Sequence, residues 1–467
     1  SDEKLERIHE ASLQVLEAVG VRITTEAARQ LLADAGCQVT DDIVKIPRRV
    51  VEDAIESAPK RIVIYDREGK ESLYLEGKNT YFGLAGTALY FRDVESGERR
   101  DARVEDIALA CRVGDALPNI DFILTPMVTK ATSEIPQGLV NQREFEAMVS
   151  NTTKPFMVLV ENATTLRDIL DIAAAVAGGA EALRLRPFVW PLLSVVSPLV
   201  YNVDTMEKLL LAVDRGAPVR VGSAPMAGGT GPVTLAGTVV LLIAETLSGL
   251  VISQLRRRGA PFIMGNSPTI LDMKTVKQCG VPEWSILSTA VVEMAHYYGL
   301  PVQNGCFYDS MDADQQSAVE HMMSVYSSIL AGTHLALYVG LLEGGLAFSP
   351  EAAVLGDEVI GMVRRMMRGL SIDDDALAVD TIRSVGHGGS FLTTEHTFRH
   401  YKREQWQPTL LCRTTFASWV EGGSKPMGEQ VKEKLAKIIR SHQVKPLPDE
   451  VKAQISDIIE RRKQSLP

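Results

Sequence analysis

Polar and aromatic side chains gather in one short stretch of the chain, residues 299–317, which reads GLPVQNGCFYDSMDADQQS. Residues 301–306 are mostly apolar and lie between glycines, which predicts a buried strand, and a long helical pattern follows. Tyr308, Asp309 and Gln316 therefore fall at a junction between a strand and a helix, where parallel α/β proteins bind ligands. The alternative is a solvated loop whose aspartates only cap the helix. We predict that the cluster as a whole lines a functional site.

Two familiar kinds of catalytic centre are not predicted. The chain has no GxSxG motif, and no lysine stands at the end of a late strand, where a Schiff-base enzyme needs one. His396 and His400 have the i, i+4 spacing of metal ligands on a helix, but HExxH is absent and Arg399 would repel a cation. The five cysteines form no CxxC pair. We therefore predict no tightly bound metal and no nucleophile–base pair.

Two glycine-rich turns are candidates for anion binding. The turn GGTGP follows a predicted strand and leads into a helix, so the backbone N–H groups of Gly229 and Thr230 are expected to be free for a carboxylate or a phosphate. The turn GHGGS near the carboxyl end is similar and contains His387 and Gly388. For each, the alternative is a tight turn without a ligand.

Aromatic side chains near strand ends suit a cationic substrate, because each ring face attracts a quaternary ammonium by roughly 0.5–2 kcal/mol. Most such rings must be ordinary core residues. The rings in or near predicted strands are Tyr81, Phe82, Tyr90, Phe91, Phe188, Trp190, Phe307, Tyr308 and Tyr338. From these and the polar residues after strands, the predicted substrate-binding set includes Phe188, Trp190, Asn266, Phe307, Tyr338 and Glu343.

The elements that must position these groups alternate regularly from Thr80 onward. Helical patterns separate eight apolar runs, at residues 81–84, 120–125, 155–160, 187–195, 218–222, 261–265, 301–305 and 335–340. Eight β-then-α units predict a (β/α)8 TIM barrel. A doubly wound sheet is the alternative, but no GxGxxG follows the first strand.

We expect three parts: an N-terminal α+β cap (residues 1–79), the barrel (80–370), and a C-terminal helical extension packed on the barrel (371–467). At 467 residues with 45% hydrophobic residues, the chain is typical of a globular protein. Its net charge of −10 argues against a nucleic-acid partner. The apolar run 233–252 contains Glu245 and is interpreted as a barrel helix rather than a membrane span. Unpaired cysteines and a charged amino terminus predict a cytoplasmic protein.

Four ordered segments of the chain resemble the trimethylamine methyltransferase superfamily, and the resemblance extends over nearly the whole chain. The segments are RIHEASLQVLEAVGV, NGCFYDSMDADQQS, YVGLLEGGLAFSPE and VGHGGSFLTTEHTFRHYKREQWQP. The resemblance implies a TIM barrel that transfers a methyl group from an amine to the Co(I) of a corrinoid (cobalamin) carried by a partner protein. We also expect a homo-oligomer.

Founding members of that family read a UAG codon as pyrrolysine near the seventh strand, whereas this region is spelled here with ordinary residues. Cys306 is the best match to the pyrrolysine position, so the implied catalytic set is Cys306, Tyr308, Asp309 and Gln316. Non-pyrrolysine relatives demethylate quaternary amines, whose nitrogen leaves as a neutral amine without a general acid. The resemblance therefore implies glycine betaine as substrate, or proline betaine or carnitine. Trimethylamine, or a non-catalytic module that binds betaine or the corrinoid protein, is the alternative.

Overall fold

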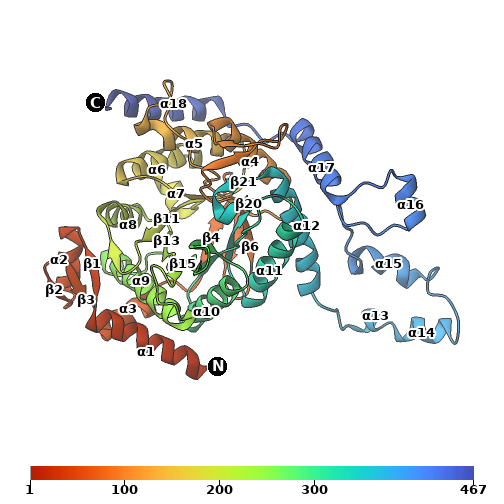
Figure 1. Ribbon diagram of the computed structural model, residues 1–467, viewed down its shortest axis with the longest axis horizontal. Helices are drawn as coiled ribbons and strands as arrows, with labels where there is room; N and C mark the ends of the chain where they lie inside the picture. Colours follow the sequence, from red (N-terminus) through yellow and green to blue (C-terminus); the bar gives the residue numbers. More distant parts are fainter. Residues whose placement is uncertain (1, 467) are drawn as a thin grey trace.

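The computed structural model describes residues 2–466, and within them eight parallel strands close into a barrel surrounded by helices (Figure 1). The last strand pairs with the first to close the ring. The strands are β6 (Tyr81–Leu84), β9 (Phe122–Leu124), β10 (Phe156–Val158), β11 (Val189–Val195), β13 (Val219–Ser223), β15 (Phe262–Asn266), β18 (Val302–Gly305) and β19 (Leu335–Val339). The predicted (β/α)8 TIM barrel is thus confirmed.

Helices follow the strands and cover the outside of the barrel. Four of them begin at a side chain that accepts a backbone N–H three residues further along: Asn162, Asn202, Asp314 and Ser349. The helices are α4 (Val104–Ala116), α5 (Val140–Ser150), α6 (Ala163–Ala177), α7 (Ala180–Leu185), α8 (Val203–Arg215), α9 (Leu235–Arg256), α10 (Glu283–Tyr297), α11 (Gln315–Ala331) and α12 (Pro350–Met367).

Helix α9 is apolar on all sides because the N-terminal segment covers its outer face. It is the one helix in the described part of the chain that is long and apolar enough to cross a membrane. Within the protein, however, 72% of its apolar 18-residue segment is buried. Helices α1 (Asp2–Ala18), α2 (Glu26–Asp34) and α3 (Arg48–Ser57) pack against it. A helix buried on every face needs no polar side, which explains its composition.

A small sheet joins this cap to the barrel. Strands β2 (Gln38–Thr40), β3 (Ile43–Lys45) and β1 (Val21–Ile23) lie side by side in that order. Strand β1 also pairs with β12 (Val200–Tyr201), which lies in the loop after the fourth barrel strand.

A hairpin closes the amino-terminal end of the barrel. Strands β4 (Ile62–Tyr65) and β5 (Glu71–Leu75) place alternate apolar side chains against the lower barrel interior. That layer consists of Phe122, Leu124, Met157, Trp190, Leu192, Ile263, Leu335 and Leu337. Since this end is filled, a ligand can approach only from the carboxyl-terminal end, which we call the mouth.

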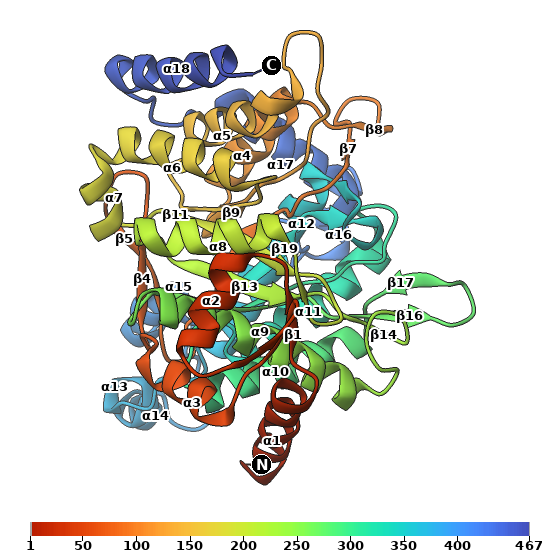
Figure 2. The same cartoon turned by 90° about the vertical axis from the view of Figure 1, so that its left-hand side faces the viewer.

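Short elements in the loops surround the mouth. One small sheet contains β14 (Met226–Ala227), β16 (Thr269–Asp272) and β17 (Lys277–Cys279). A second contains β7 (Tyr90–Arg92), β8 (Arg99–Asp101), β20 (Leu341–Leu342) and β21 (Ala347–Phe348). Single 3-10 turns, η1 (Gln137–Leu139) and η2 (Glu343–Gly345), complete the loops. The β16–β17 hairpin projects beyond the barrel on the right of Figure 2.

The C-terminal extension has two different parts. Helix α17 (Met427–Ser441) packs on α12 and α4, and α18 (Asp449–Gln464) packs on α6 and α5. Residues 370–425, which we call the arm, instead project away from the barrel (Figure 1). The arm contains α13 (Asp374–Leu377), α14 (Val379–Val385), α15 (Glu395–Glu404) and α16 (Phe416–Glu421). The sequence predicts that the C-terminal extension packs on the barrel. Helices α17 and α18 do so, whereas the arm does not.

Candidate functional site

The ring of Tyr338 lies across the upper barrel interior, held between two glycines. A Cβ added to Gly86 would lie 2.2 Å from the ring Cδ1, and one added to Gly305 would lie 2.3 Å from the ring Cε2. The Tyr338 hydroxyl is 3.0 Å from the hydroxyl of Ser267, which follows β15. Tyr338 is only partly buried. The glycines thus make room for an aromatic platform at the carboxyl-terminal end of the barrel.

A guanidinium lies beside this platform. Arg220 of β13 is 2% exposed, its Nε donates to Oε1 of Gln303, and its Nη1 is 3.5 Å from the Leu193 carbonyl oxygen. Burial lowers the pKa of Arg220 to about 10, so the side chain keeps its positive charge near neutral pH. The upper barrel interior therefore combines a fixed cation with an aromatic face.

Two buried amides extend this polar layer. Asn266 donates from Nδ2 to the Gln303 carbonyl oxygen at 2.8 Å. The Oδ1 atoms of Asn266 and Asn304 have no hydrogen-bond partner within residues 2–466. An acceptor left without a partner costs about 1–3 kcal/mol, so such atoms are concentrated where a ligand or water completes the network.

Strained backbone is concentrated at the same end of the barrel. Ala85, Thr87, Tyr338 and Glu343 all have positive φ, at 58°, 63°, 80° and 57°. These residues end or follow β6 and β19, and the pairing of those two strands shifts register between Ala336 and Val339. Left-handed backbone outside glycine is unfavourable and persists where the surrounding structure imposes it, often at functional sites. The strain supports the mouth as the site.

Cys306 and Tyr308 face the helix layer instead of this interior. The Tyr308 ring stacks on His321 of α11 with centroids 3.9 Å apart and an angle of 11° between the planes. The Cys306 sulfur lies 4.0 Å from the Ser328 hydroxyl of the same helix. Burial raises the pKa of the Cys306 thiol to about 11 and the pKa of Tyr308 well above its usual value. The expectation that both contact substrate must be corrected, because both side chains are enclosed between β18 and α11.

Asp309 and Gln316 have structural partners. Asp309 accepts the Gly280 N–H at 2.9 Å, which ties the loop after β18 to the segment before α10, and burial raises its pKa. Asp314, not Asp309, caps α11. Gln316 donates to Glu320 at 2.8 Å. Of the predicted catalytic set, Cys306 and Tyr308 are buried, Asp309 is half-buried and Gln316 is exposed at the start of α11.

Phe307 and Glu343 do lie together above the barrel. The Gly344 N–H donates to the Tyr308 carbonyl oxygen at 2.8 Å, so η2 is fastened over the loop after β18. Phe307 packs beside Gly344. Glu343 pairs with Arg99 at 2.8 Å, and the Arg99 guanidinium lies 3.3 Å above the Tyr90 ring. The Glu343 carboxylate is therefore already neutralised by a rim cation.

The structure does not bring Phe188 and Trp190 to the mouth. Phe188 packs against Phe156 in the layer between barrel and helices. Trp190 is fully buried in the lower interior, with its ring 5.8 Å from that of Phe122. The expectation that Phe188 and Trp190 contact substrate is therefore wrong. Both lie at the start of a buried strand, where an aromatic side chain packs in the core and not at the mouth.

The turn with Gly229 and Thr230 is closed by its own hydrogen bonds. The N–H of Gly229 donates to the Met226 carbonyl oxygen at 2.8 Å, and the N–H of Gly231 donates to the same oxygen at 3.0 Å. The Thr230 hydroxyl accepts the Met226 N–H at 2.9 Å. The turn thus uses the N–H groups of Gly229 and Gly231 internally, so the expectation that the Gly229 N–H is free is wrong.

His387 and Gly388 lie in the arm, away from the mouth. Figure 2 shows α14, which precedes them, on the opposite side of the molecule from the β16–β17 hairpin. A Cβ added to Gly388 would meet no atom within 4 Å. Within one chain these two residues therefore contribute nothing to a site in the barrel.

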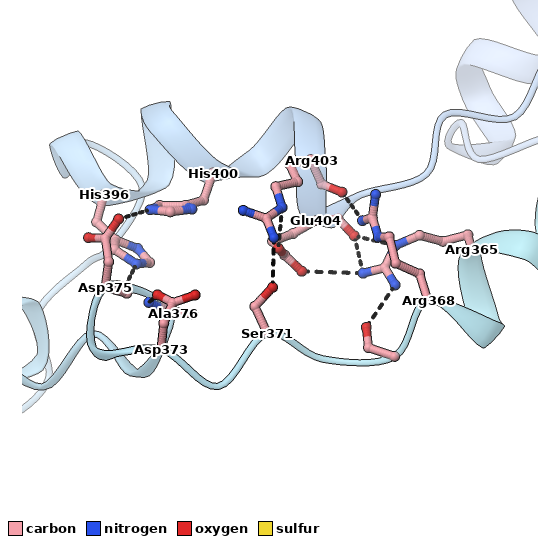
Figure 3. Close-up of polar contacts among 11 residues, drawn as sticks. Arg365, Arg368, Ser371, Asp373, Asp375, Ala376, His396, His400, Arg403 and Glu404 are labelled. Carbon is pink, nitrogen blue, oxygen red and sulfur yellow. Dashed lines mark hydrogen bonds and ion pairs between the residues drawn. The ribbon is translucent and has the colours of Figure 1, made fainter.

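Asp375, His396 and His400 form the one group of potential metal ligands found in residues 2–466 (Figure 3). His400 Nε2 is 2.9 Å from the Asp375 carboxylate, and His396 Nε2 is 2.9 Å from the Asp375 carbonyl oxygen. Arg399 also pairs with Asp375, at 3.1 Å. These contacts connect α13 to α15. Because Arg399 already pairs with the Asp375 carboxylate, that carboxylate is not free to bind a metal cation. The absence of a bound metal stays a prediction.

Sequence reasoning missed Arg220 and Gln303. Arg220 carried a usable signal, because an arginine inside the apolar strand VRVGS must be paired or functional when buried. Gln303 is a common polar residue, and its position in the sequence carries no such signal. Its role depends on which face of the strand points inward, and that becomes known only with the barrel.

A closed (β/α)8 barrel with a strained, polar layer at its mouth defines a TIM-barrel enzyme. Comparison with known families gives the particular one: the model of the trimethylamine methyltransferase (MTTB) family matches residues 1–467. The chain therefore belongs to the trimethylamine methyltransferase family, whose members are corrinoid-dependent methyltransferases.

Curated relatives include enzymes named for two substrates. The chain is 34% identical over 464 residues to the trimethylamine methyltransferase MttB of Desulfitobacterium hafniense (strain DCB-2), covering 98% of this chain and 93% of that protein. It is 30% identical over 426 residues to the glycine betaine methyltransferase of Desulfitobacterium hafniense (strain Y51), covering 90% and 88%. The two identities do not distinguish the two substrates.

Among solved structures, the monomethylamine methyltransferase MtmB of Methanosarcina barkeri aligns with a TM-score of 0.53 at 12% identity. The alignment covers 99% of this chain and 87% of that one. At this identity the likeness supports the fold alone.

Proposed function

We propose that this enzyme transfers a methyl group from a quaternary amine, with glycine betaine as the first candidate, to the Co(I) of a partner corrinoid protein. Dimethylglycine is then the product that leaves. The observation that carries the proposal is the Tyr338 ring, which is fixed by Gly86 and Gly305 and is only partly buried. A ring face held there attracts a quaternary ammonium without itself reacting.

The proposed methyl transfer needs no general acid or general base. When the N–CH3 bond of a quaternary amine breaks, the electron pair stays on nitrogen and a neutral amine leaves, so no proton moves. The docked corrinoid supplies the nucleophile that accepts the methyl group. The protein must orient the methyl carbon and exclude water. Cys306 and Tyr308, with raised pKa values, stay protonated and do not compete as nucleophiles.

The direct test is turnover. The chain is incubated with reduced cobalamin and glycine betaine, and dimethylglycine is quantified by NMR, with a cobalamin-free control. We expect dimethylglycine only in the complete mixture. Formation of dimethylamine from trimethylamine alone would favour the second candidate, and binding of betaine without any product would indicate a non-catalytic module.

The loops around the mouth suit a docking protein. Seven large apolar side chains on loops after six different barrel strands are between 46% and 74% exposed. They are Leu89, Val196, Val233, Met273, Val276, Met311 and Leu346. Apolar side chains repeated around one opening are typical of an interaction surface, since isolated chains rarely expose large apolar patches. We propose that this rim receives the corrinoid protein.

Charged residues on the β16–β17 hairpin should weaken this docking. For the double variant Met273→Asp with Val276→Asp, we expect KM for the corrinoid protein to rise at least about tenfold. Because neither side chain belongs to the barrel interior, the rate with free cobalamin should not change. Val19→Asp, at a 57% exposed position just after α1, is the matched control. An unchanged KM in the double variant would place the partner elsewhere.

Two apolar surfaces of the chain remain uncovered, and they support a homo-oligomer. The arm has five large apolar residues that are 77–83% exposed: Leu370, Ile372, Leu392, Phe398 and Phe416. Helix α11 exposes an outward stripe at i, i+4, i+7 and i+11: Val319, Met323, Tyr326 and Leu330. In a homo-oligomer, a second copy of the chain would cover both the arm and the α11 stripe.

The base of the arm is fixed in a direction away from its own barrel. Arg365 of α12 donates to the Glu404 carbonyl oxygen at 2.7 Å (Figure 3). Glu358 of α12 accepts the Thr409 and Leu410 N–H groups at 2.9 Å each. Helix α12 therefore holds both the start of the arm, which it joins directly, and residues 404–410 within it. We propose that each arm covers the α11 stripe of a second copy.

Charge placed on either surface should separate the copies. We expect the wild type to exceed the 51.0 kDa of one chain by light scattering, and Phe398→Glu or Tyr326→Glu to reduce the mass toward that of the monomer. Val19→Glu serves as control. Mixing the two variants should restore part of the association, because one arm–stripe contact per pair stays intact. A monomeric wild type would contradict the proposal.

A further inference from the structure

Arg220 directs its charge toward the mouth. In the barrel Arg220 pairs with Ile263, yet its Nε and Cζ lie beside Gly265, two residues closer to the carboxyl end of β15. A Cβ added to Gly265 would lie 2.1 Å from that Nε. The side chain therefore extends upward along the interior, to the level at which Gln303 and Tyr338 form the polar layer.

No acid among residues 2–466 balances this charge. Only burial and the Tyr338 phenol influence the ionisation of Arg220, and no carboxylate among the described residues does so. Its hydrogen bonds use Nε and Nη1, whereas Nη2 donates to no atom of residues 2–466. A cation taken out of water costs several kcal/mol unless it is paired. A guanidinium left unpaired inside a barrel is expected where a ligand supplies the anion.

Arg67 shows what a structural guanidinium looks like in the same chain. It is also buried, at 7% exposure, and donates to the carbonyl oxygens of Val149 and Lys445 at 2.6 Å and 2.5 Å. Burial lowers the pKa of Arg67, but the nearby carboxylates of Glu68, Asp115 and Asp66 favour its charged form. Arg220 lacks any such acid among the residues that the structure describes.

We propose that Arg220 binds the carboxylate of the substrate, so that the substrate class is a small zwitterion with a quaternary nitrogen and a carboxylate. The inference rests on the proposed methyl transfer from a quaternary amine and names the anionic half of that substrate. Planar guanidinium groups pair with carboxylates through two parallel hydrogen bonds. Trimethylamine carries no anion and leaves Arg220 unpaired.

This pairing also orients the substrate. With the carboxylate held beside Arg220 and Gln303, the ammonium lies against the Tyr338 ring, and a methyl group points toward the mouth. The methyl carbon then faces the side from which the corrinoid protein approaches. The buried cation would thus set which end of the zwitterion meets the nucleophile.

Calorimetric titration without any cobalt tests the inference. Glycine betaine is compared with choline, which replaces the carboxylate by CH2OH, and with acetate, which has only the carboxylate. We expect the wild type to bind glycine betaine more tightly than choline. Arg220→Met should bind glycine betaine on the order of a hundredfold more weakly and choline nearly as before. Arg67→Met is the matched control and should keep the preference of the wild type.

Thermal unfolding provides a second readout. Because Arg220→Met removes an unpaired buried charge, we expect its melting temperature to equal or exceed that of the wild type, whereas Arg67→Met should lower it. If Arg220→Met does not fold, Arg220→Lys provides the test instead. The lysine keeps the positive charge on a shorter side chain, so we expect an affinity for glycine betaine below that of the wild type.

Equal affinity of the wild type for glycine betaine and choline overturns the inference, as does wild-type affinity for glycine betaine in folded Arg220→Met. Binding of acetate that depends on Arg220, in a chain that forms no dimethylglycine, supports the inference while the proposed methyl transfer fails. Normal dimethylglycine formation by Arg220→Met overturns the inference while the proposed methyl transfer stands.

Discussion

Replacing Gly305 by alanine should reduce methyl transfer by about a hundredfold or more while leaving the outer barrel folded. The new Cβ would lie 2.3 Å from the Tyr338 ring, and Gly86 on the other side prevents the ring from retreating. The ring must therefore tilt out of its plane, and a displacement near 1 Å at a positioning group costs about 10²-fold in rate. Overpacking should also cost roughly 1–3 kcal/mol of unfolding free energy.

Turnover with reduced cobalamin and chemical denaturation check this prediction together. Gly428→Ala is the control, because a Cβ added there meets no atom within 4 Å. Tyr338→Phe keeps the ring and should retain most activity, whereas Tyr338→Leu should resemble Gly305→Ala. A folded Gly305→Ala enzyme with the wild-type rate would mean that the Tyr338 ring does not position the substrate.

Replacing Tyr308 by alanine should destabilise the fold strongly and change the chemistry little. The ring is 1% exposed and stacked on His321, so its removal leaves a cavity between β18 and α11. Removing a buried large aromatic side chain costs about 3–5 kcal/mol. Denaturant unfolding should show this loss, while the rate per folded molecule stays close to that of the wild type.

Tyr308→Phe separates packing from polar effects. It keeps the stacked ring, so its unfolding free energy should lie near that of the wild type. If Tyr308→Ala were instead stable and lost affinity for glycine betaine, Tyr308 would contact the ammonium, as the sequence alone suggests. The two variants therefore distinguish a core tyrosine from a substrate-binding one.

The barrel is predictable because its strands are apolar runs separated by helical patterns. Eight such runs between residues 81 and 340 match the eight barrel strands within a few residues. The arm is not predictable in this way, because exposed and covered helices have similar local periodicity. Which helix is left uncovered depends on contacts far apart in the chain, such as those between α12 and Glu404.

The site is harder to predict because side chains alternate between the two faces of a strand. The sequence pattern correctly places residues 301–306 at a strand end near the mouth. However, Gln303 and Gly305 point inward, whereas Cys306 contacts α11. Tyr338 is among the predicted residues, yet its position across the barrel depends on the register shift in β19. Tertiary pairing decides such details, and a single sequence does not contain them.

The sequence signal of Arg220, an arginine in an apolar strand, does not establish its role, for a related reason. A charged residue in a strand is unremarkable when it faces solvent, and only the closed barrel shows that this one faces inward without an acid among the described residues.

The central claim is that the enzyme demethylates a zwitterionic quaternary amine, and one competition experiment tests it most directly. Equal concentrations of glycine betaine and trimethylamine are supplied with reduced cobalamin, and dimethylglycine and dimethylamine are quantified from the same mixture. The ratio of products reports the ratio of kcat/KM for the two substrates. We predict dimethylglycine in at least about hundredfold excess, since trimethylamine offers no carboxylate to Arg220 and no fixed charge to Tyr338. An excess of dimethylamine would contradict this claim.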